Sequence, residues 1–519
     1  MFKNHPKGLL PAALANMGER FGYYIMNAVL LLFLISKFGV SEETGGIIYS
    51  VFYAGIYILS LVGGLIADRI KNYKGTIQTG LMVMAAGYVL LSIPILATAE
   101  NHVWLLTFTC IALFFIAFGN GLFKGNLQAI VGQMYDNFEK DAATKGEEAL
   151  KKAKAQRDPG FQIFYVFINV GGLIAPFVAP LLRSWWLGKQ SLTYNAKLPT
   201  LCHQYINDGM AMGANQLADL NDLVVKVGGT ASNDLTAFCT QYLDVFNTGV
   251  HYSFIASVAA MLISLVIFLS YKNIFPNPIK VKKEVENYTK EEKIKMAKEI
   301  KQRIYALFAV LGIAVFFWFA FHQNGQSLSL FARDFVVTSK IPPEIWQAIN
   351  PFFVIVLTPI IIWLFARMSK KGKEPSTPRK IAIGMGIASL AFVFMIIISS
   401  ISGYPSGTEF RSLEETVSEG LKAGPWVLIV LYFFLTVAEL FISPLGLSFV
   451  SKVAPKHLQG LCQGLWLGAT ALGNLLLWIG PLLYNRYPIW ICWTVFFALC
   501  IISMVVMLSM VKWVEKVAK

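Results

Sequence analysis

The chain has 519 residues, of which 56% are hydrophobic and only 14% charged, and its formal net charge is +14. Soluble proteins average about 25% charged residues, so the composition excludes an ordinary soluble domain and indicates a polytopic membrane protein. Lys and Arg gather in alternate loops between apolar stretches. This pattern is typical of membrane topology and argues against a nucleic-acid partner.

Twelve apolar segments are long enough to cross a bilayer as helices. In chain order they cover residues 9–36, 45–68, 76–98, 103–135, 161–186, 248–271, 304–332, 345–368, 380–402, 424–451, 459–484 and 487–511. An even number of spans puts both termini on one side of the membrane. The loops on that side hold 32 Lys and Arg residues and the opposite loops hold ten. We therefore expect both termini in the cytoplasm.

The cytoplasmic stretch 273–303 separates two halves of six segments each, residues 1–272 and 304–519. Within it, Thr289 and Glu292 form a capping-box pattern, which predicts an amphipathic helix. Two such halves around a midplane cavity are typical of major facilitator transporters. We predict an all-α fold of twelve transmembrane helices in two six-helix bundles. The outward stretch 187–247 is too long for a simple connection, so we expect it to form a small folded cap.

The first segment carries charges where a bilayer normally excludes them. Its polar residues recur at helical spacing on one narrow face, at positions Asn16, Glu19, Arg20, Tyr23 and Asn27. A charged group at membrane depth costs at least a few kcal/mol unless it is paired or faces water. This face is therefore expected to line an interior cavity. A structural ion pair that merely tolerates burial is the alternative.

Two more charges lie at membrane depth, Lys124 in the fourth segment and Glu439 in the tenth. With Glu19 and Arg20 they sum to zero, and the excess of cations lies in the first half. Such a field fits a zwitterion, with its carboxylate toward Arg20 and Lys124 and its ammonium toward Glu439. The alternative is that Lys124 pairs with Glu19 and that Glu439 is neutral, because low dielectric favours a protonated carboxyl.

Two features at or beyond the ends of the apolar segments suggest a gate for the cavity and a disulfide bond. Asp68 and Arg69 follow a glycine pair at the cytoplasmic end of the second segment and are placed to pair with another helix and gate the cavity. This loop resembles the signature loop of major facilitators. Cys202 and Cys239 share the polar stretch 187–247. They would form a disulfide if that stretch faces an oxidising space, and the sequence leaves both outcomes open.

Several stretches together resemble the proton-dependent oligopeptide transporter family. The first-helix run from Glu19 to Tyr24 resembles the family signature E-x-x-E-R-F-x-Y-Y, and residues 164–171 resemble F-Y-x-x-I-N-x-G. Further matches lie at Gln347 to Pro351, Lys373 to Ser376, Ser443 to Pro455 and Gly464 to Trp466. Because the matches fall in both halves and in the family's order, the resemblance covers most of the chain.

The resemblance implies a role in peptide binding for each matching position. Arg20 and Lys124 would meet the peptide carboxylate, and Glu439 with Asn169 and Asn350 the amino terminus. Tyr23, Tyr24 and Tyr57 would line the backbone site, and Ser443 and Trp466 a side-chain pocket. Packing or a place in an interfacial belt is the alternative for the aromatic residues, and interhelical hydrogen bonding is the alternative for the asparagines.

The chain departs from the family pattern at positions that bear charge. Asn16 replaces the first glutamate of the first-helix motif, Asn27 replaces an arginine, and His322 lies where relatives carry an acidic residue. Glu19 alone, paired to Arg20 and Lys124, would be too stabilised as an anion to carry a proton. We hypothesise that His322 or Glu439 carries the coupling proton, since histidine titrates near neutral pH. A neutral His322 bonded to a neighbouring helix is the alternative.

The predicted function is import of di- and tripeptides coupled to protons by alternating access. We expect a monomer in the plasma (inner) membrane, in contact with lipid, with peptides and protons as its ligands and no cofactor besides the proton gradient. A different cargo (an amino-acid derivative, a drug or an anion), altered or absent proton coupling, and a non-transporting receptor remain open. We do not expect an enzyme, because the spans contain no H-E-x-x-H motif and no metal-spaced cluster of His, Asp and Glu.

Overall fold

The computed structural model describes residues 5–228, 234–276, 290–337, 341–373, 375–453 and 459–518. Nearly all of these residues are helical, and the β-structure among them is a single isolated bridge between Val336 and Ala423. The helices of the first half are α1 (Leu9–Phe38), α2 (Glu42–Ile70), α3 (Tyr73–Ser92), α4 (His102–Ala143), α5 (Glu147–Lys189), α6 (Leu198–Asp208), η1 (Gly209–Ala211), α7 (Ala214–Lys226) and α8 (Leu235–Ser270).

The second half begins within the described residues at Lys290. Its helices are α9 (Lys290–Phe321), η2 (His322–Gly325), α10 (Ser327–Asp334), η3 (Pro343–Ala348), α11 (Ile349–Lys370), α12 (Thr377–Ile401), α13 (Gly407–Ser412), α14 (Glu415–Leu421), α15 (Trp426–Val453), α16 (Gln459–Leu475), α17 (Ile479–Arg486) and α18 (Ile489–Ala518). Residues 277–289 of the predicted linker, with Thr289 of the capping box, lie outside the described residues, as do Glu374 and Pro455 of the family matches.

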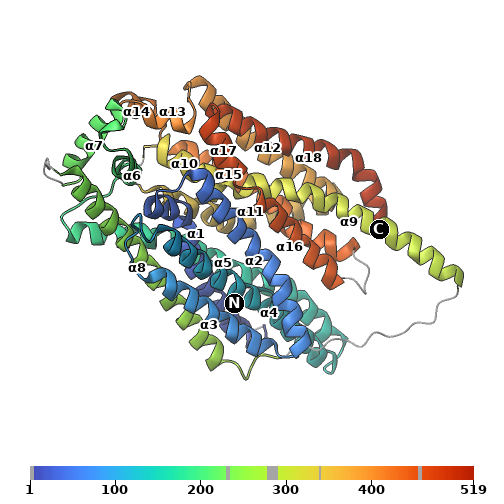
Figure 1. Cartoon of the computed structure of the whole chain (residues 1–519). Coiled ribbons are helices and arrows are strands. Elements are labelled where there is room, and N and C mark those ends of the chain that lie inside the picture. Colours follow the sequence, from blue (N-terminus) through green and yellow to red (C-terminus); the bar gives the residue numbers. More distant parts are fainter. Residues whose placement is uncertain are drawn as a thin grey trace.

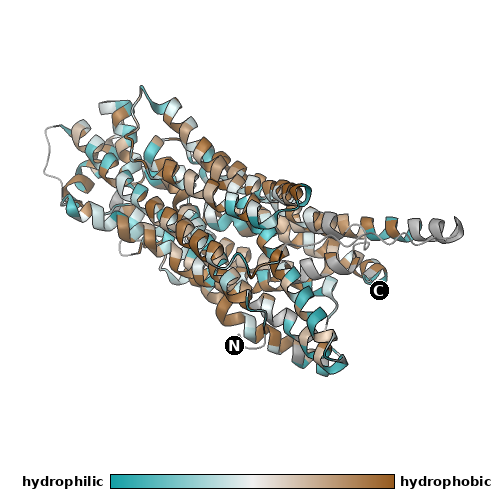
Figure 2. Ribbon diagram, turned by 90° about the horizontal axis from the view of Figure 1, so that it is seen from below, coloured by the Kyte–Doolittle hydropathy of each residue, from teal (hydrophilic) through white to brown (hydrophobic). Residues whose placement is uncertain are grey.

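Twelve spans in the described residues are long and apolar enough to cross a membrane, which confirms the number read from the sequence. Three of these spans contain more than one helical element. The seventh changes from α9 to the 3-10 turn η2 at His322, the eighth changes from the 3-10 turn η3 to α11 at Ile349, and the eleventh breaks between α16 and α17. Apolar residues run along the lengths of the helices in Figure 2, whereas polar residues gather toward their ends. The chain is therefore a multi-pass membrane protein.

The spans form two bundles (Figure 1). In the first bundle α1 packs on α5 and α8, while α2 and α3 pack on α4. In the second bundle α12 packs on α15 and α18, and α9 packs on α16 and α18. The bundles meet where α2 contacts α16 and α17 and where α5 contacts η3 and α11. The predicted fold class is confirmed.

Local sequence signals explain where the first helices begin and end. Gly39, with φ of 61°, ends α1 in the left-handed conformation that glycine adopts without strain. Ser41 then accepts a hydrogen bond from the backbone of Thr44 and begins α2. Asn72 caps α3 in the same way through Gly75. These caps fix the turns that join the first three spans.

Small residues allow the helices of the first bundle to approach closely. A Cβ atom on Gly63 of α2 would overlap the backbone of Gly121 on α4, and one on Gly80 of α3 would overlap the carbonyl of Gly119. Close backbone approach through small residues is a general device of membrane helix packing. It holds α2, α3 and α4 as one unit.

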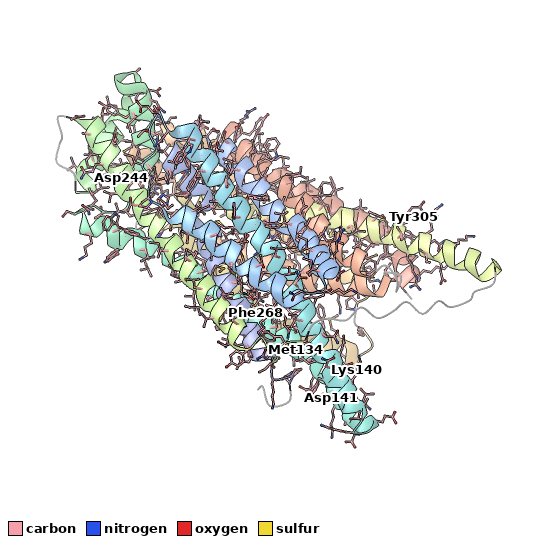
Figure 3. All side chains as sticks on the ribbon, turned by 60° about the horizontal axis from the view of Figure 1, so that its bottom comes forward. Met134, Lys140, Asp141, Asp244, Phe268 and Tyr305 are labelled. Carbon is pink, nitrogen blue, oxygen red and sulfur yellow. The ribbon has the colours of Figure 1, made fainter. Side chains whose placement is uncertain are left out.

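The two ends of the molecule differ. At one end, which we call the cap end, α6 and α7 from the first bundle lie beside α13 and α14 from the second (Figure 1). Residues 187–247 thus contribute folded helices there, although α8 begins at Leu235, earlier than the sequence pattern indicated. At the other end α4 projects from the bundle, as Lys140 and Asp141 show far from Asp244 in Figure 3.

The close approach of α2 and α4 gives a testable prediction. The change Gly63→Val should lower the free energy of unfolding by about 1–3 kcal/mol, the usual cost of overpacking, because the added carbons meet the Gly121 backbone. Thermal unfolding in detergent measures this loss. The matched control is Gly64→Val, since a Cβ on Gly64 meets nothing within 4 Å. Equal unfolding temperatures for the two variants would contradict the packing.

Candidate functional site

Glu19 and Arg20 lie side by side on α1 and are buried, with 0% and 6% of their surfaces exposed. Arg20 Nε donates to Glu19 Oε2 at 2.6 Å, and Arg20 Nη2 donates to Oε1 at 2.7 Å. Asn120 of α4 donates a third hydrogen bond to Oε1, also at 2.6 Å. Such pairing offsets the cost of holding charge at membrane depth. Glu19 is thus held by its neighbours on two helices.

Lys124 of α4 takes a different partner from the one the sequence suggested. Its Nζ lies 4.3 Å from the centroid of the Tyr57 ring on α2, a cation–π contact. Within the described residues no carboxylate approaches Lys124 to 4.0 Å, and the third hydrogen bond to Glu19 comes from Asn120. The direct Lys124–Glu19 ion pair, which the sequence offered as an alternative, is thus not formed among the described residues. The Lys124 ammonium retains donors for an anionic ligand.

Glu439 of α15 supplies the anion of the second bundle. Asn350 of α11 donates to Glu439 Oε2 at 2.9 Å, and the same amide nitrogen lies 3.0 Å from the Thr436 hydroxyl. Both Glu439 and Asn350 are only partly buried. A neutral amide balances a carboxylate less than a cation does, so Glu439 is the less fully compensated of the two carboxylates.

Tyrosines connect the charges of the two bundles. Tyr24 and Tyr57 are each close enough to both Arg20 and Glu439 to interact with them electrostatically. Tyr165 of α5 also interacts with Glu439, and 39% of its surface is exposed. The cations of the first bundle and the anion of the second therefore face one shared set of aromatic hydroxyl groups. This arrangement can hold a ligand with opposite charges at its two ends.

The remaining predicted binding residues lie around this set with different surroundings. Tyr23 is buried, and the centroid of its ring lies 4.8 Å from the guanidinium carbon of Arg20. Asn169 of α5 is buried and its amide donates to the Tyr165 carbonyl at 3.0 Å. Ser443 of α15 is partly exposed, whereas Trp466 of α16 is 4% exposed and packs on Gly446. Trp466 thus packs as its structural alternative predicts, whereas the hydrogen bond of Asn169 stays within α5 and is not the interhelical bond of its alternative.

His322 occupies the break in the seventh span. Its Nδ1 lies 2.5 Å from Asn474 Oδ1 on α16, and because that oxygen only accepts, Nδ1 donates. The imidazole is stacked on Trp318 at 4.8 Å between ring centroids and lies 4.9 Å from Tyr53. The other ring nitrogen remains available for a second proton. Lys124 is close enough to interact with this ring electrostatically.

A charged network missed by the sequence analysis joins the bundles at the cap end. Glu42, at the start of α2, forms ion pairs with Arg333 of α10 and with Arg411 of α13, the latter at 3.2 Å. Asp334 accepts from Arg333 at 2.7 Å and from Arg411 at 2.9 Å, and the Tyr484 hydroxyl donates to it at 2.9 Å. Glu42, Arg333 and Asp334 are all buried.

A second buried ion pair crosses between the bundles nearby. Arg183 of α5 donates to Glu344 of η3 through two nitrogens, at 2.6 and 3.4 Å. The guanidinium carbon lies 4.2 Å above the Tyr194 ring. A cavity of about 20 Å³, lined by both Arg183 and Arg333, lies between the two sets of ion pairs. Both sets therefore close the same end of the interface.

Sequence signals for this network did exist. Arg183 lies inside the fifth apolar segment, Arg333 and Asp334 come directly after the seventh, and Glu344 precedes the eighth. Each is a charged residue at the edge of a span. Like Lys124, such a residue indicates a buried charge that needs a partner or has a function. The predicted gating residues lie elsewhere: Asp68 accepts a hydrogen bond from Tyr73, and Arg69 is exposed. A gating role for Asp68 and Arg69 stays a prediction.

The cap brings together the two cysteines of the polar stretch. Cys202 of α6 and Cys239 near the start of α8 are both free thiols with 0% of their surfaces exposed, and they are close enough to interact. Burial, with Cys239 as its neighbour, raises the pKa of the Cys202 thiol.

Lys197, just before α6, donates to Ser418 of α14 at 3.0 Å. Burial and the nearby Lys422 lower the pKa of this Lys197 ammonium.

The geometry defines a class of protein. The described residues contain no group of three or more His, Cys, Asp or Glu side chains that could hold a metal ion. Twelve spans in two bundles, with buried cations in one bundle and an anion in the other near the same tyrosines, define a secondary transporter of the major facilitator type. A sequence model of the POT family matches residues 74–287 and 276–489. The chain belongs to the POT family, which confirms the resemblance to proton-dependent oligopeptide transporters and makes it a transporter, not an enzyme.

Curated relatives agree along nearly the whole chain. The peptide transporter YePEPT of Yersinia enterocolitica is 28% identical over 497 residues, which cover 91% of this chain and 87% of the relative. Dipeptide and tripeptide permease B of Shigella dysenteriae is 28% identical over 475 residues, covering 89% and 83% of the two chains. The match thus includes both bundles.

Solved structures share the fold. A crystal structure of the peptide transporter POT in complex with sulfate has a TM-score of 0.70 at 21% identity and covers 100% of this chain and 96% of its own. A POT family transporter in complex with 5-aminolevulinic acid has a TM-score of 0.69 at 21% identity, covering 100% and 98%. At this identity the likeness concerns the fold.

The ion pair of Arg183 and Glu344 yields a second prediction. The change Glu344→Gln leaves the Arg183 guanidinium buried without its carboxylate, which should cost about 3–5 kcal/mol of stability. Thermal unfolding in detergent provides the measurement. The matched control is Glu43→Gln, which breaks the exposed pair of Glu43 with Arg486 at 3.3 Å and should cost about 0–1 kcal/mol. If both variants unfold at the temperature of the wild type, the buried pair does not stabilise this state.

Proposed function

We propose that the chain imports di- and tripeptides together with protons by alternating access of the site between its two bundles. One observation carries the proposal: Tyr57 contacts Lys124 of the first bundle and is close enough to interact with Arg20 of the first bundle and Glu439 of the second. A peptide is a zwitterion whose ends match these charges. Its carboxylate would meet Arg20 and Lys124, and its ammonium would meet Glu439 and Asn350.

The surroundings of the charges suit cargo with variable side chains. Tyr24, Tyr57 and Tyr165 present hydroxyl groups and ring faces, which contact a peptide backbone without demanding one side chain. Asn350 combines a donor and an acceptor, as a peptide group requires. In this proposal Asn169 and Tyr23 support the site from behind, and Ser443 and Trp466 border a side-chain pocket.

The ion pairs at the cap end correspond to one state of the transport cycle. In the proposed topology both termini lie in the cytoplasm of a cell with this protein in its plasma (inner) membrane, and the cap end faces outward. Glu42 with Arg333 and Arg183 with Glu344 then close the outward side. Uptake requires these ion pairs to separate so that peptide can enter from outside. A bound peptide that bridges the two bundles then favours the state in which the ion pairs form again. Asp68 and Arg69 would act at the cytoplasmic end.

The moving parts in this proposal are residues 1–272 and 304–519, joined by the linker 273–303. One chain contains both bundles and all the charges of the site. The functional unit is therefore a monomer. The proton gradient is the energy source, and no cofactor is required.

The proton is best assigned away from the first helix. Glu19 already accepts three N–H donors, two of them from a guanidinium. Asn16, the position of the missing glutamate, cannot titrate. Glu439 is bonded to the neutral amide of Asn350, so protonating it breaks no ion pair. His322 has a free ring nitrogen and remains the second candidate, although its bond to Asn474 equally suits a structural histidine.

Uptake into proteoliposomes tests the function directly. An inward proton gradient should drive accumulation of labelled dialanine, and the change Lys124→Gln should weaken peptide binding about 10-fold or more, the value of a hydrogen bond to a charged group. Excess unlabelled di- and tripeptides should compete with dialanine, whereas free amino acids and inorganic anions should not. Accumulation that ignores the proton gradient, or competition by anions alone, would contradict the proposal.

The proton assignment makes a separate prediction. With Glu439→Gln, gradient-driven accumulation should be lost, while peptide exchange at saturating concentration without a gradient should persist. The change His322→Gln should reduce accumulation if the histidine takes part, and full coupling in that variant rules it out. The control variant is Glu148→Gln, which removes an exposed carboxylate whose partner is Lys152 of the same helix. Intact coupling in Glu439→Gln would overturn the assignment to Glu439.

A further inference from the structure

Two cysteines meet within the cap although 37 residues separate them in sequence. Cys202 lies on α6 and Cys239 on the first turns of α8, and these helices pack together. Both side chains are wholly buried at this contact between α6 and α8, and the two free thiols are close enough to interact. The fold has thus done what a disulfide requires, which is to bring two sulfur atoms from distant segments together.

The other cysteines of the chain provide a contrast. Cys492 and Cys500 both lie on α18, and eight residues of helix separate them by about 12 Å along the axis. Cys110 is exposed on α4, and Cys462 is buried on α16. Cys110, Cys492 and Cys500 lie within membrane-spanning segments and Cys462 lies just before one, whereas Cys202 lies on α6, outside the spans, and Cys239 lies in the first turns of the span α8. Cys202 and Cys239 therefore differ from the other four cysteines because they lie on two helices that pack together at the cap end.

We propose that Cys202 and Cys239 form a disulfide that anchors α6 to α8 in the mature protein. The inference rests on the proposed topology, in which the cap faces the oxidising side of the membrane. The two thiols lose two protons and two electrons, and the sulfur–sulfur bond forms. The oxidant is the disulfide of a protein thiol oxidase, which is reduced to two thiols. Oxidation precedes the burial of the pair, while the cap is still folding.

The disulfide fixes a helix that contacts both bundles. His203, the neighbour of Cys202, lies with its Nε2 2.7 Å from the Ser36 carbonyl at the end of α1. Lys197, one residue before α6, donates to Ser418 of α14 in the second bundle. A covalent link to α8 restricts the unfolded chain and so stabilises the folded cap. It holds the first-bundle side of the Lys197–Ser418 contact in place.

Differential alkylation tests the inference. Protein purified without reductant is denatured, alkylated, digested and analysed by mass spectrometry. We expect one cross-linked pair of peptides containing Cys202 and Cys239, while Cys462, Cys492 and Cys500 are alkylated as free thiols. Reductant should lower the thermal unfolding temperature of the wild type and leave that of the variant Cys202→Ala/Cys239→Ala unchanged. Full alkylation of Cys202 and Cys239 before reduction would overturn the disulfide.

A separate arm distinguishes failure of the inference from failure of the topology. In the variant Cys202→Ala/Cys239→Ala, the exposed Asp222 of α7 is changed to cysteine. A membrane-impermeant maleimide should label this cysteine in whole cells. Labelling together with free Cys202 and Cys239 in the wild type refutes the disulfide and keeps the topology. Absence of labelling refutes the outward placement on which both proposals depend.

Discussion

A charge held at membrane depth must find a partner, and this constraint governs the interior of the protein. Glu19 and Arg20 satisfy it between themselves, with Asn120 as a third member. Lys124 and Glu439 satisfy it less completely, through the Tyr57 ring and the Asn350 amide. Around the central site, the described residues therefore form one closed ion pair and leave two opposite charges with neutral partners, one in each bundle. A zwitterionic ligand would supply the missing opposite charges, an anion for Lys124 and a cation for Glu439.

The same constraint explains how the bundles are held at the cap end. Glu42 with Arg333, and Arg183 with Glu344, are buried pairs whose members come from different bundles. Separating such a pair leaves two charges to be hydrated, so the state described here is favoured until water and ligand can enter. The transport cycle exchanges these contacts for those of a bound peptide. A proton that neutralises Glu439 would change this balance at the site itself, because it removes the charge that meets the peptide ammonium.

The sequence predicted the elements that depend on local pattern. Hydrophobic length revealed twelve spans, and helical periodicity placed Glu19 and Arg20 on one buried face. It could not predict which neighbour a charge chooses, because Asn120 lies 101 residues from Glu19 and Glu344 lies 161 residues from Arg183. The break at His322 was also hidden, as was the close packing of Tyr49 of α2 against Gly325 beside it. These features depend on tertiary contacts, which the helical periodicity of the sequence does not predict.

The central claim is that the two ends of a peptide bind to charges in opposite bundles. A binding cycle between ligand and protein groups tests it most directly. Calorimetry would compare dialanine with its N-acetylated and C-amidated forms, on the wild type and on Glu439→Gln and Lys124→Gln. We predict that N-acetylation weakens binding to the wild type but hardly further to Glu439→Gln, and that C-amidation behaves likewise toward Lys124→Gln. Equal losses in all three proteins would contradict the claim.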